Sequence, residues 1–256
     1  MSERGATVSV QQPRRFGGLP DRPDPRDVAY TPTAAARPAV VDLRAQCPPV
    51  YDQGRLGSCT ANAIAGALQF DRMKQRLADF VPSRLFIYYN ERVLGNTVDT
   101  DSGASIRDGI KTVAAQGDCP ETAWPYDPTR FAEKPPQSCY DQAVAYKAVS
   151  YRRVSHGLDD MKSCLAEGYP FVFGIAIYWN YPQYSTTGAI PMPGDAAPAH
   201  QGHTMLAVGY DDSTRLFTIR NSHGTDWGHQ GYGTIPYEFL TRPDLSQDFW
   251  TIHVVM

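Results

Sequence analysis

The stretch Gln53–Thr60, Q-G-R-L-G-S-C-T, sets a glutamine amide six residues before a cysteine that opens a helical pattern. After Cys59, apolar residues recur at spacings of three and four, which predicts a helix with one buried face; they are Ala61, Ile64, Ala65 and Leu68. A thiol is mostly protonated near neutral pH, but the free N–H groups and the dipole of a helix's first turn favour the thiolate. Gly57 permits a close backbone approach and Ser58 is a good N-cap. The stretch therefore predicts a thiol nucleophile.

A base for this thiol lies downstream in G-H-T-M-L-A-V-G-Y, where His203 begins an apolar run. A later run, R-L-F-T-I-R-N-S, leads to Asn221, whose side-chain carbonyl can accept a hydrogen bond from one imidazole nitrogen and leave the other for the sulfur. Cysteine, histidine and asparagine in this order, with the histidine roughly 130–150 residues after the cysteine, are typical of papain-type cysteine peptidases.

From about Val41 to the C-terminus the chain resembles the papain-like cysteine peptidase family. V-D-L-R resembles the family's mature N-terminus and Q-G-x-x-G-S-C its nucleophile loop. H-T-M-L-A-V-G-Y resembles the histidine strand, and N-S-H-G-T-D-W-G-H-Q-G-Y-G the asparagine loop. Several motifs in the correct order are a strong signal. The resemblance implies an α+β, two-lobe fold with a helical lobe, an antiparallel β-barrel-like lobe and the active cleft between them.

The resemblance also implies roles for individual residues. Cys59 would be the nucleophile, His203 the general base and acid, and Asn221 the group that orients the imidazole. Gln53 would donate to the oxyanion together with the Cys59 amide, because an amide donates without carrying a charge. The implied substrate-binding residues are Ser102, Gly103, Ala104, Ser105 and Thr204, and the implied structural residues near the site are Gly57, Ser58, His223 and Trp227.

Two departures from the family pattern stand out. The family usually has C-x-x-C-W, whereas this chain has Leu56 and Thr60 at the outer positions, so that disulfide is absent. The family also tends to place tryptophan directly after N-S, where this chain has His223. We expect this second titratable ring to make the activity more sensitive to pH. An unchanged pH–rate profile in a His223→Trp variant would contradict this.

The first 37 residues read as an extended arm, because they are rich in proline and poor in large apolar side chains. Two interpretations remain open: a pro-segment or lid that covers the cleft, and a disordered leader. Residues 38–256 form the expected catalytic domain, with a helical lobe at about 51–148 and a β lobe at about 38–50 and 149–256.

Periodicity predicts the elements of this domain. Beyond the nucleophile helix we expect helices at 82–92, 106–114 and 158–167. We expect strands at 171–177, 203–210, 215–220, 233–237 and 249–255.

The composition of the chain limits the classes of partner that we expect it to bind. The formal charge of −3 and the scattered basic residues do not predict a nucleic-acid face, and the pairs Arg14-Arg15 and Arg152-Arg153 read as solvated surface. No apolar stretch is long enough to cross a bilayer and no Sec signal appears, so we expect a cytoplasmic protein or one exported by another route.

No cofactor is implied. The histidines form a poor metal-ligand set without the paired short spacings of zinc sites; those considered are His200, His203, His223 and His229. Besides Cys59 the chain has Cys47, Cys119, Cys139 and Cys164, which allow three pairings. A bridge between Cys119 and Cys139 is one of them.

The predicted function is a cysteine endopeptidase that hydrolyses peptide bonds of a peptide or protein substrate through a thioacyl intermediate. Deamidation, isopeptide cleavage and transpeptidation share this intermediate and stay open, as does a binding module without turnover.

Overall fold

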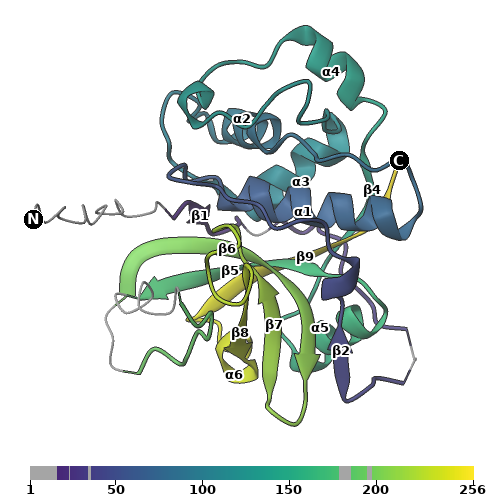
Figure 1. Ribbon diagram of the computed structural model, residues 1–256, viewed down its shortest axis with the longest axis vertical. Helices are drawn as coiled ribbons and strands as arrows, with labels where there is room; N and C mark the ends of the chain where they lie inside the picture. The colour runs from purple at the N-terminus through teal and green to yellow at the C-terminus, as the bar shows by residue number, and fades with distance from the viewer. Residues whose placement is uncertain (1–15, 23, 34–35, 179–185, 195–197) are drawn as a thin grey trace, which may run out of the picture.

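Helices and sheet occupy opposite sides of the molecule. The computed structural model describes residues 16–22, 24–33, 36–178, 186–194 and 198–256, with the backbone alone for 198–201. Figure 1 shows α1 to α4 on one side and the sheet, with α5 and α6, on the other. The helices are α1 (Cys59–Lys74), α2 (Arg84–Gly95), α3 (Ile106–Ala115), α4 (Gln137–Ala143), α5 (Leu158–Ala166) and α6 (Tyr237–Thr241), with single 3-10 turns at Arg44–Gln46 and Pro128–Arg130. The predicted helices at 82–92, 106–114 and 158–167 correspond to α2, α3 and α5.

Local sequence signals set the ends of two of these helices. The Ser83 hydroxyl caps α2 by accepting from the Phe86 amide, and Asn96 ends the helix in the left-handed conformation. The Ser105 hydroxyl caps α3 by accepting from the Asp108 amide. These caps satisfy N–H groups that the first turn of a helix leaves without an internal partner.

The nucleophile helix α1 is buried on almost all sides and not, as the sequence predicted, on one face. Its residues from Cys59 to Arg72 are buried, because α1 packs against α2 and α3 and also against β6 and β9 of the sheet. A helix enclosed between two layers has no solvent-facing stripe.

The sheet is open. Its strands are β1 (Gly18–Leu19), β2 (Val40–Asp42), β3 (Ala104–Ser105), β4 (Ala148–Arg153), β5 (Phe171–Tyr178), β6 (Pro198–Asp211), β7 (Leu216–Arg220), β8 (Tyr232–Pro236) and β9 (Ser246–Val255). The main path runs β3-β1-β6-β5-β9-β4, with β2 and β7 also on β6 and β8 on β7. Among the described residues the path does not close, so the barrel-like expectation was wrong. The long strand β6 instead pairs along its length with four neighbours.

The N-terminal arm contributes a strand of its own between the two layers (Figure 1). We call Phe16–Leu19 the cleft strand. Gly18 pairs in parallel with Ala104 of β3 and antiparallel with Gly202 of β6. Further along the arm, Tyr30 is buried in the core. Among the described residues of the arm, the cleft strand and Tyr30 are thus part of the packed structure.

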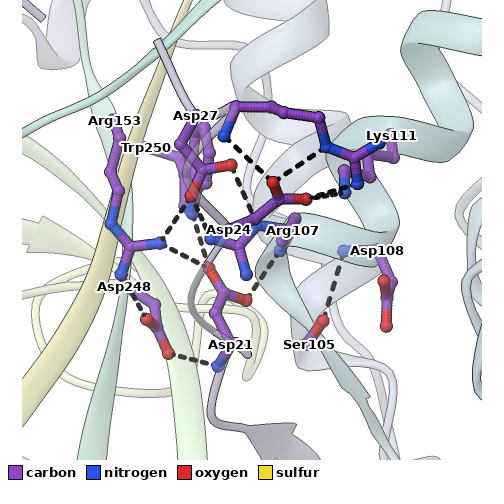
Figure 2. Close-up of polar contacts among 11 residues, drawn as sticks. Asp21, Asp24, Asp27, Ser105, Arg107, Asp108, Lys111, Arg153, Asp248 and Trp250 are labelled. Atoms are coloured by element: carbon purple, nitrogen blue, oxygen red, sulfur yellow. Dashed lines mark hydrogen bonds and ion pairs between the residues drawn. The ribbon is translucent and has the colours of Figure 1, made fainter. Parts of the chain in front are cut away.

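After the cleft strand the arm is fixed by a charged cluster, shown in Figure 2, that we call the ion clamp. It joins arm carboxylates to groups on α3, β4 and β9, and its members are Asp21, Asp24, Asp27, Arg107, Lys111, Arg153, Asp248 and Trp250. Arg153 pairs with Asp248 at 2.9 Å and with Asp21 at 3.3 Å. Reading Arg152-Arg153 as solvated surface was therefore wrong for Arg153, since its partners come from distant parts of the chain.

All five cysteines are free thiols, and Cys119 and Cys139 are both buried. Within the described ranges no helix combines the length and the apolar character that a membrane span requires.

Candidate active site

Cys59 is the first residue of α1, as its sequence position predicted. The preceding Ser58 occupies the N-cap position, but its side chain makes no capping hydrogen bond. Its hydroxyl lies instead 2.6 Å from the hydroxyl of Tyr126, which donates in turn to the carbonyl of Gln53 at 2.9 Å. Ser58 therefore fixes the loop before the helix and does not satisfy the helix's own N–H groups.

His203 and Asn221 lie together on the sheet side. His203 is on β6, Asn221 directly follows β7, and both are buried. The Nε2 atom of His203 is 2.8 Å from the Oδ1 atom of Asn221. The structure thus brings together the imidazole and the amide that the sequence paired.

Hydrogen bonds to the asparagine loop and to its own loop hold Gln53 before α1. Its backbone N–H donates to the Ser222 carbonyl at 2.9 Å, and its Oε1 accepts from the Ser222 hydroxyl at 2.5 Å. Its Nε2 donates to the Leu56 carbonyl at 2.9 Å. The asparagine loop therefore positions the glutamine amide. The N-S pair by itself predicts no role for Ser222, because the role follows only from the group that its side chain contacts in the fold.

The cleft strand covers Cys59, whose side chain is fully buried. Burial raises the pKa of the Cys59 thiol, and hydrogen bonds from the backbone of Gly17 and from Thr204 act in the opposite direction. The sequence predicted that the helix start favours the thiolate. With the arm in place, removal of the sulfur from water outweighs this effect.

Only glycine fits where the arm passes the nucleophile loop. A Cβ atom added to Gly17 would lie 1.8 Å from the carbonyl oxygen of Gly57. On the other side Gly103, at a φ of 75°, would place a Cβ 2.0 Å from the Gly17 oxygen. The Ala104 amide donates to that same oxygen at 2.9 Å. The arm therefore runs in backbone contact with both walls.

The predicted substrate wall is where the cleft strand lies. Ala104 and Ser105 form β3 and pair with Gly18 and Leu19. The Thr204 hydroxyl would lie 3.1 Å from a Cβ on Gly18. Ser105 also caps α3, so its side chain has a structural role that the sequence did not predict.

A cavity of about 400 Å³ continues beside the cleft strand. Its lining includes Phe16, Leu19 and Ser102 on one side and Ile175 and Ser246 on the other. The arm therefore leaves part of this groove open, next to the predicted wall.

His223 and Trp227 complete the surroundings of the His203–Asn221 pair. The His223 ring stacks on the His203 ring, with 4.9 Å between centroids and 28° between planes. Trp227 is buried and meets His223 edge-on, with 6.2 Å between ring centroids. The Phe16 ring of the arm contacts both histidines, at 5.2 Å and 6.0 Å.

Among the described side chains, no three histidine, cysteine or acidic groups are placed to hold a metal ion.

An α+β fold with a cysteine at a buried helix start, facing a sheet that carries a histidine–asparagine pair, defines a papain-like cysteine peptidase. Comparison with known proteins agrees. The papain family cysteine protease profile matches residues 37–239, and the chain belongs to this family.

Several relatives illustrate the similarity. The "Uncharacterized peptidase C1-like protein L477" of Acanthamoeba polyphaga mimivirus is 40% identical over 94% of this chain and 88% of its own length. Cathepsin K of Gallus gallus is 30% identical over 91% of this chain and 70% of its own. The crystal structure of xylellain, a cysteine protease from Xylella fastidiosa, superposes with a TM-score of 0.87 at 45% identity and covers 97% of this chain and 100% of its own.

A digestive procathepsin L 3 from Tenebrio molitor has a TM-score of 0.74 at 20% identity, over 89% of this chain and 74% of its own, which shows the shared fold. The chain is a cysteine-type peptidase.

Proposed function

We propose that the chain is an endopeptidase in which Cys59 attacks the peptide carbonyl, His203 is the general base and acid, and Asn221 orients the imidazole. The observation that carries this assignment is the 2.8 Å contact between Nε2 of His203 and Oδ1 of Asn221. Thr204, the residue after His203 on β6, contacts Cys59. An oxygen acceptor at Nε2 directs the other ring nitrogen to the sulfur.

The reaction proceeds in two steps. The thiolate attacks the carbonyl carbon, and the oxyanion receives hydrogen bonds from the Cys59 amide and from Nε2 of Gln53. The imidazolium of His203 then protonates the leaving amine as the C–N bond breaks and the thioester remains. Water gives a proton to the same imidazole, attacks the thioester and releases the acid. Losing one oxyanion donor costs roughly 10²–10³ in rate, so Gln53→Ala should lose activity on that scale.

The groove already holds an extended polypeptide, since the cleft strand pairs with β3 and β6 through its backbone. A groove that hydrogen-bonds a backbone from both sides suits a peptide or protein substrate. The predicted residues Ser102, Gly103, Ala104, Ser105 and Thr204 line this groove in our proposal.

The decisive experiment incubates a peptide mixture with the chain carrying Gly17→Val, whose added side chain collides with Gly57 and displaces the cleft strand, and with the same variant carrying Cys59→Ala as well, followed by mass spectrometry. New peptide termini only in the variant that keeps Cys59 support the endopeptidase. Mass shifts of about one dalton without cleavage would indicate deamidation, and no change in either sample would indicate a binding module. Inactivation by a thiol-alkylating epoxide, with activity unaffected by chelators, would support the thiol chemistry.

We propose further that the arm keeps the peptidase latent. The cleft strand occupies the space between Gly57 and Gly103 and buries Cys59, so a substrate carbonyl cannot reach the sulfur until the strand leaves. Excision of residues 1–37 is a poor test, because it also removes Tyr30, which belongs to the core, and the arm carboxylates of the ion clamp. Displacing the cleft strand alone by a point substitution is sharper.

A further inference from the structure

His223 is the residue through which this chain's site differs from the family pattern, and its ring is buried at the centre of the site. It stacks on His203 and is flanked by Phe16 and Trp227. A tryptophan there would only shield; an imidazole also carries two nitrogens that can donate or accept.

The orientation of the Asn221 amide follows from its neighbours. The Ser222 backbone N–H, which can only donate, lies 2.8 Å from Oδ1 of Asn221. The Oδ1 atom is therefore the oxygen and not a flipped nitrogen. Since oxygen only accepts, His203 must carry its proton on Nε2, which lies 2.8 Å from the same Oδ1.

The other side of the amide then defines the state of His223. Nδ2 of Asn221 is a donor, and it lies 3.3 Å from Nδ1 of His223. For this contact to be a hydrogen bond, Nδ1 must hold a lone pair, so His223 is neutral with its proton on Nε2. Two donors would face each other if His223 were protonated.

Protonation would also place a second positive charge beside the catalytic imidazole. His203 becomes cationic during the reaction, and its ring centroid is 4.9 Å from that of His223. Two other titratable groups of the described residues lie near: Cys59, which contacts Thr204 next to His203, and Asp52, whose backbone bridges to His223. The Asp52 carboxylate is exposed and accepts from the Gly54 amide at 2.8 Å, so solvent screens its interaction with that charge.

We propose that neutral His223 is a positioning residue that locks the Asn221 amide in the orientation His203 needs, and that its protonation unlocks the amide and stops turnover. This rests on the proposed function. Histidine changes charge in the pH range just below neutrality. On the acid side of the pH profile, kcat/KM therefore falls with the protonation of His223 as well as with the protonation of the Cys59–His203 pair.

Two matched substitutions separate the hydrogen bond from the titration. In His223→Asn the side-chain oxygen can stand where Nδ1 was, accepting from Asn221 without titrating. In His223→Leu no acceptor remains. The kinetics use the full-length chain and the same chain carrying Gly17→Val, whose added side chain collides with Gly57 and displaces the cleft strand.

We expect His223→Asn to keep kcat within a few-fold of the wild type near pH 8, while the slope of log kcat/KM on the acid side falls from about 2 to about 1. We expect His223→Leu to lose roughly tenfold in kcat near pH 8 with little change in KM, because it removes an interaction that orients the base, and to share the acid-side slope of about 1, because leucine does not titrate. An acid limb unchanged by His223→Asn, or a kcat unchanged by His223→Leu, would overturn the inference.

A second readout does not depend on activity. Nitrogen NMR of the full-length chain with labelled histidine should show Nδ1 of His223 without a proton at pH 8 and with one after acidification. A proton on Nδ1 at pH 8 would overturn the inference. If neither the wild type nor the Gly17→Val chain cleaves peptide, the proposed function fails, and the NMR result still decides whether His223 holds the amide.

Discussion

The two parts of the arm are held by different physics. The cleft strand is held mainly through its backbone: apart from the Phe16 ring, which contacts His203 and His223, it pairs by its main chain and fits because Gly17 leaves no Cβ to meet Gly57. The ion clamp, which follows within a few residues, is almost entirely side-chain contact. Contact through the backbone alone is sensitive to any added atom. The strength of a network of charges, in contrast, depends on the identity of each partner and on its solvent exposure.

Two backbone amides report on these parts separately by hydrogen exchange. The Ala104 amide donates to the Gly17 oxygen and reports on the cleft strand, while the Asp21 amide donates to Asp248 and reports on the ion clamp. If the two amides always lose protection together, the arm is a single unit and its two parts are not held independently.

The largest effect should come from Gly17→Val. Because the clash with Gly57 is with backbone, neither side can yield cheaply. We expect peptidase activity of the full-length chain to rise on the order of tenfold or more, since the occluded population falls. The Ala104 amide should lose protection while the Asp21 amide keeps it.

Leu19→Ala is the matched control within the arm. The Leu19 side chain is 46% exposed, so its removal should leave activity and both amides nearly unchanged. An increase in Leu19→Ala as large as that in Gly17→Val would show that any change in the arm activates, and would contradict the steric argument.

A smaller effect should follow from Arg107→Met in the ion clamp. The Arg107 side chain is 5% exposed and pairs with Asp27, so its loss leaves a carboxylate without its main cation. We expect a loss of about 3 kcal/mol in the free energy of unfolding by urea. The Asp21 amide should lose more protection than the Ala104 amide.

Lys111→Met tests whether exposure decides the size of this effect. Lys111 pairs with Asp24 at 3.1 Å, but its side chain is 38% exposed. An exposed pair contributes about 0–1 kcal/mol, so this variant should unfold close to the wild type. Equal losses in the two variants would contradict the distinction between buried and exposed pairs.

The smallest effect should come from acidification between pH 7 and pH 5. Burial, and then the neighbouring Asp248, raise the pKa of Asp21. A carboxyl with a raised pKa in the docked arm favours docking when protonated, and this contribution is lost as the pH rises through the docked pKa.

The Arg26 side chain, which belongs to the arm itself, lowers the pKa of Asp24, and Lys111 of α3 lowers it further. Only the Lys111 contact contributes to docking; its contribution is present above the ordinary aspartate range and is lost as the pH falls from that range through the lowered pKa. Neither group should therefore open the ion clamp between pH 7 and pH 5, and the Asp21 amide should keep its protection after correction for intrinsic exchange. Release of the arm at pH 5 would mean that another clamp group controls docking.

Sequence patterns predicted the elements well where periodicity is strong. The helix beginning at Cys59 and the strands near 171–177 and 203–210 lie where the patterns placed them, because buried faces impose regular apolar spacing. The expectation for 233–237 was partly wrong, since β8 ends at Pro236 and Tyr237 begins α6. Proline there cannot continue the ladder but can precede a helix.

What the chain alone determined is the set and order of reactive groups: a cysteine at a helix start, a later histidine, an asparagine after the next strand and a glutamine before them. Spacing and residue chemistry suffice for this, because they are local properties.

Only the tertiary structure decided which distant groups meet. Ser222 holds Gln53 across 169 residues, Asp21 meets Trp250 across 229, and Gly17 passes between Gly57 and Gly103. Such contacts follow from how the layers pack and not from any local preference, so the cover over Cys59 and the role of His223 beside Asn221 could be recognised only in three dimensions.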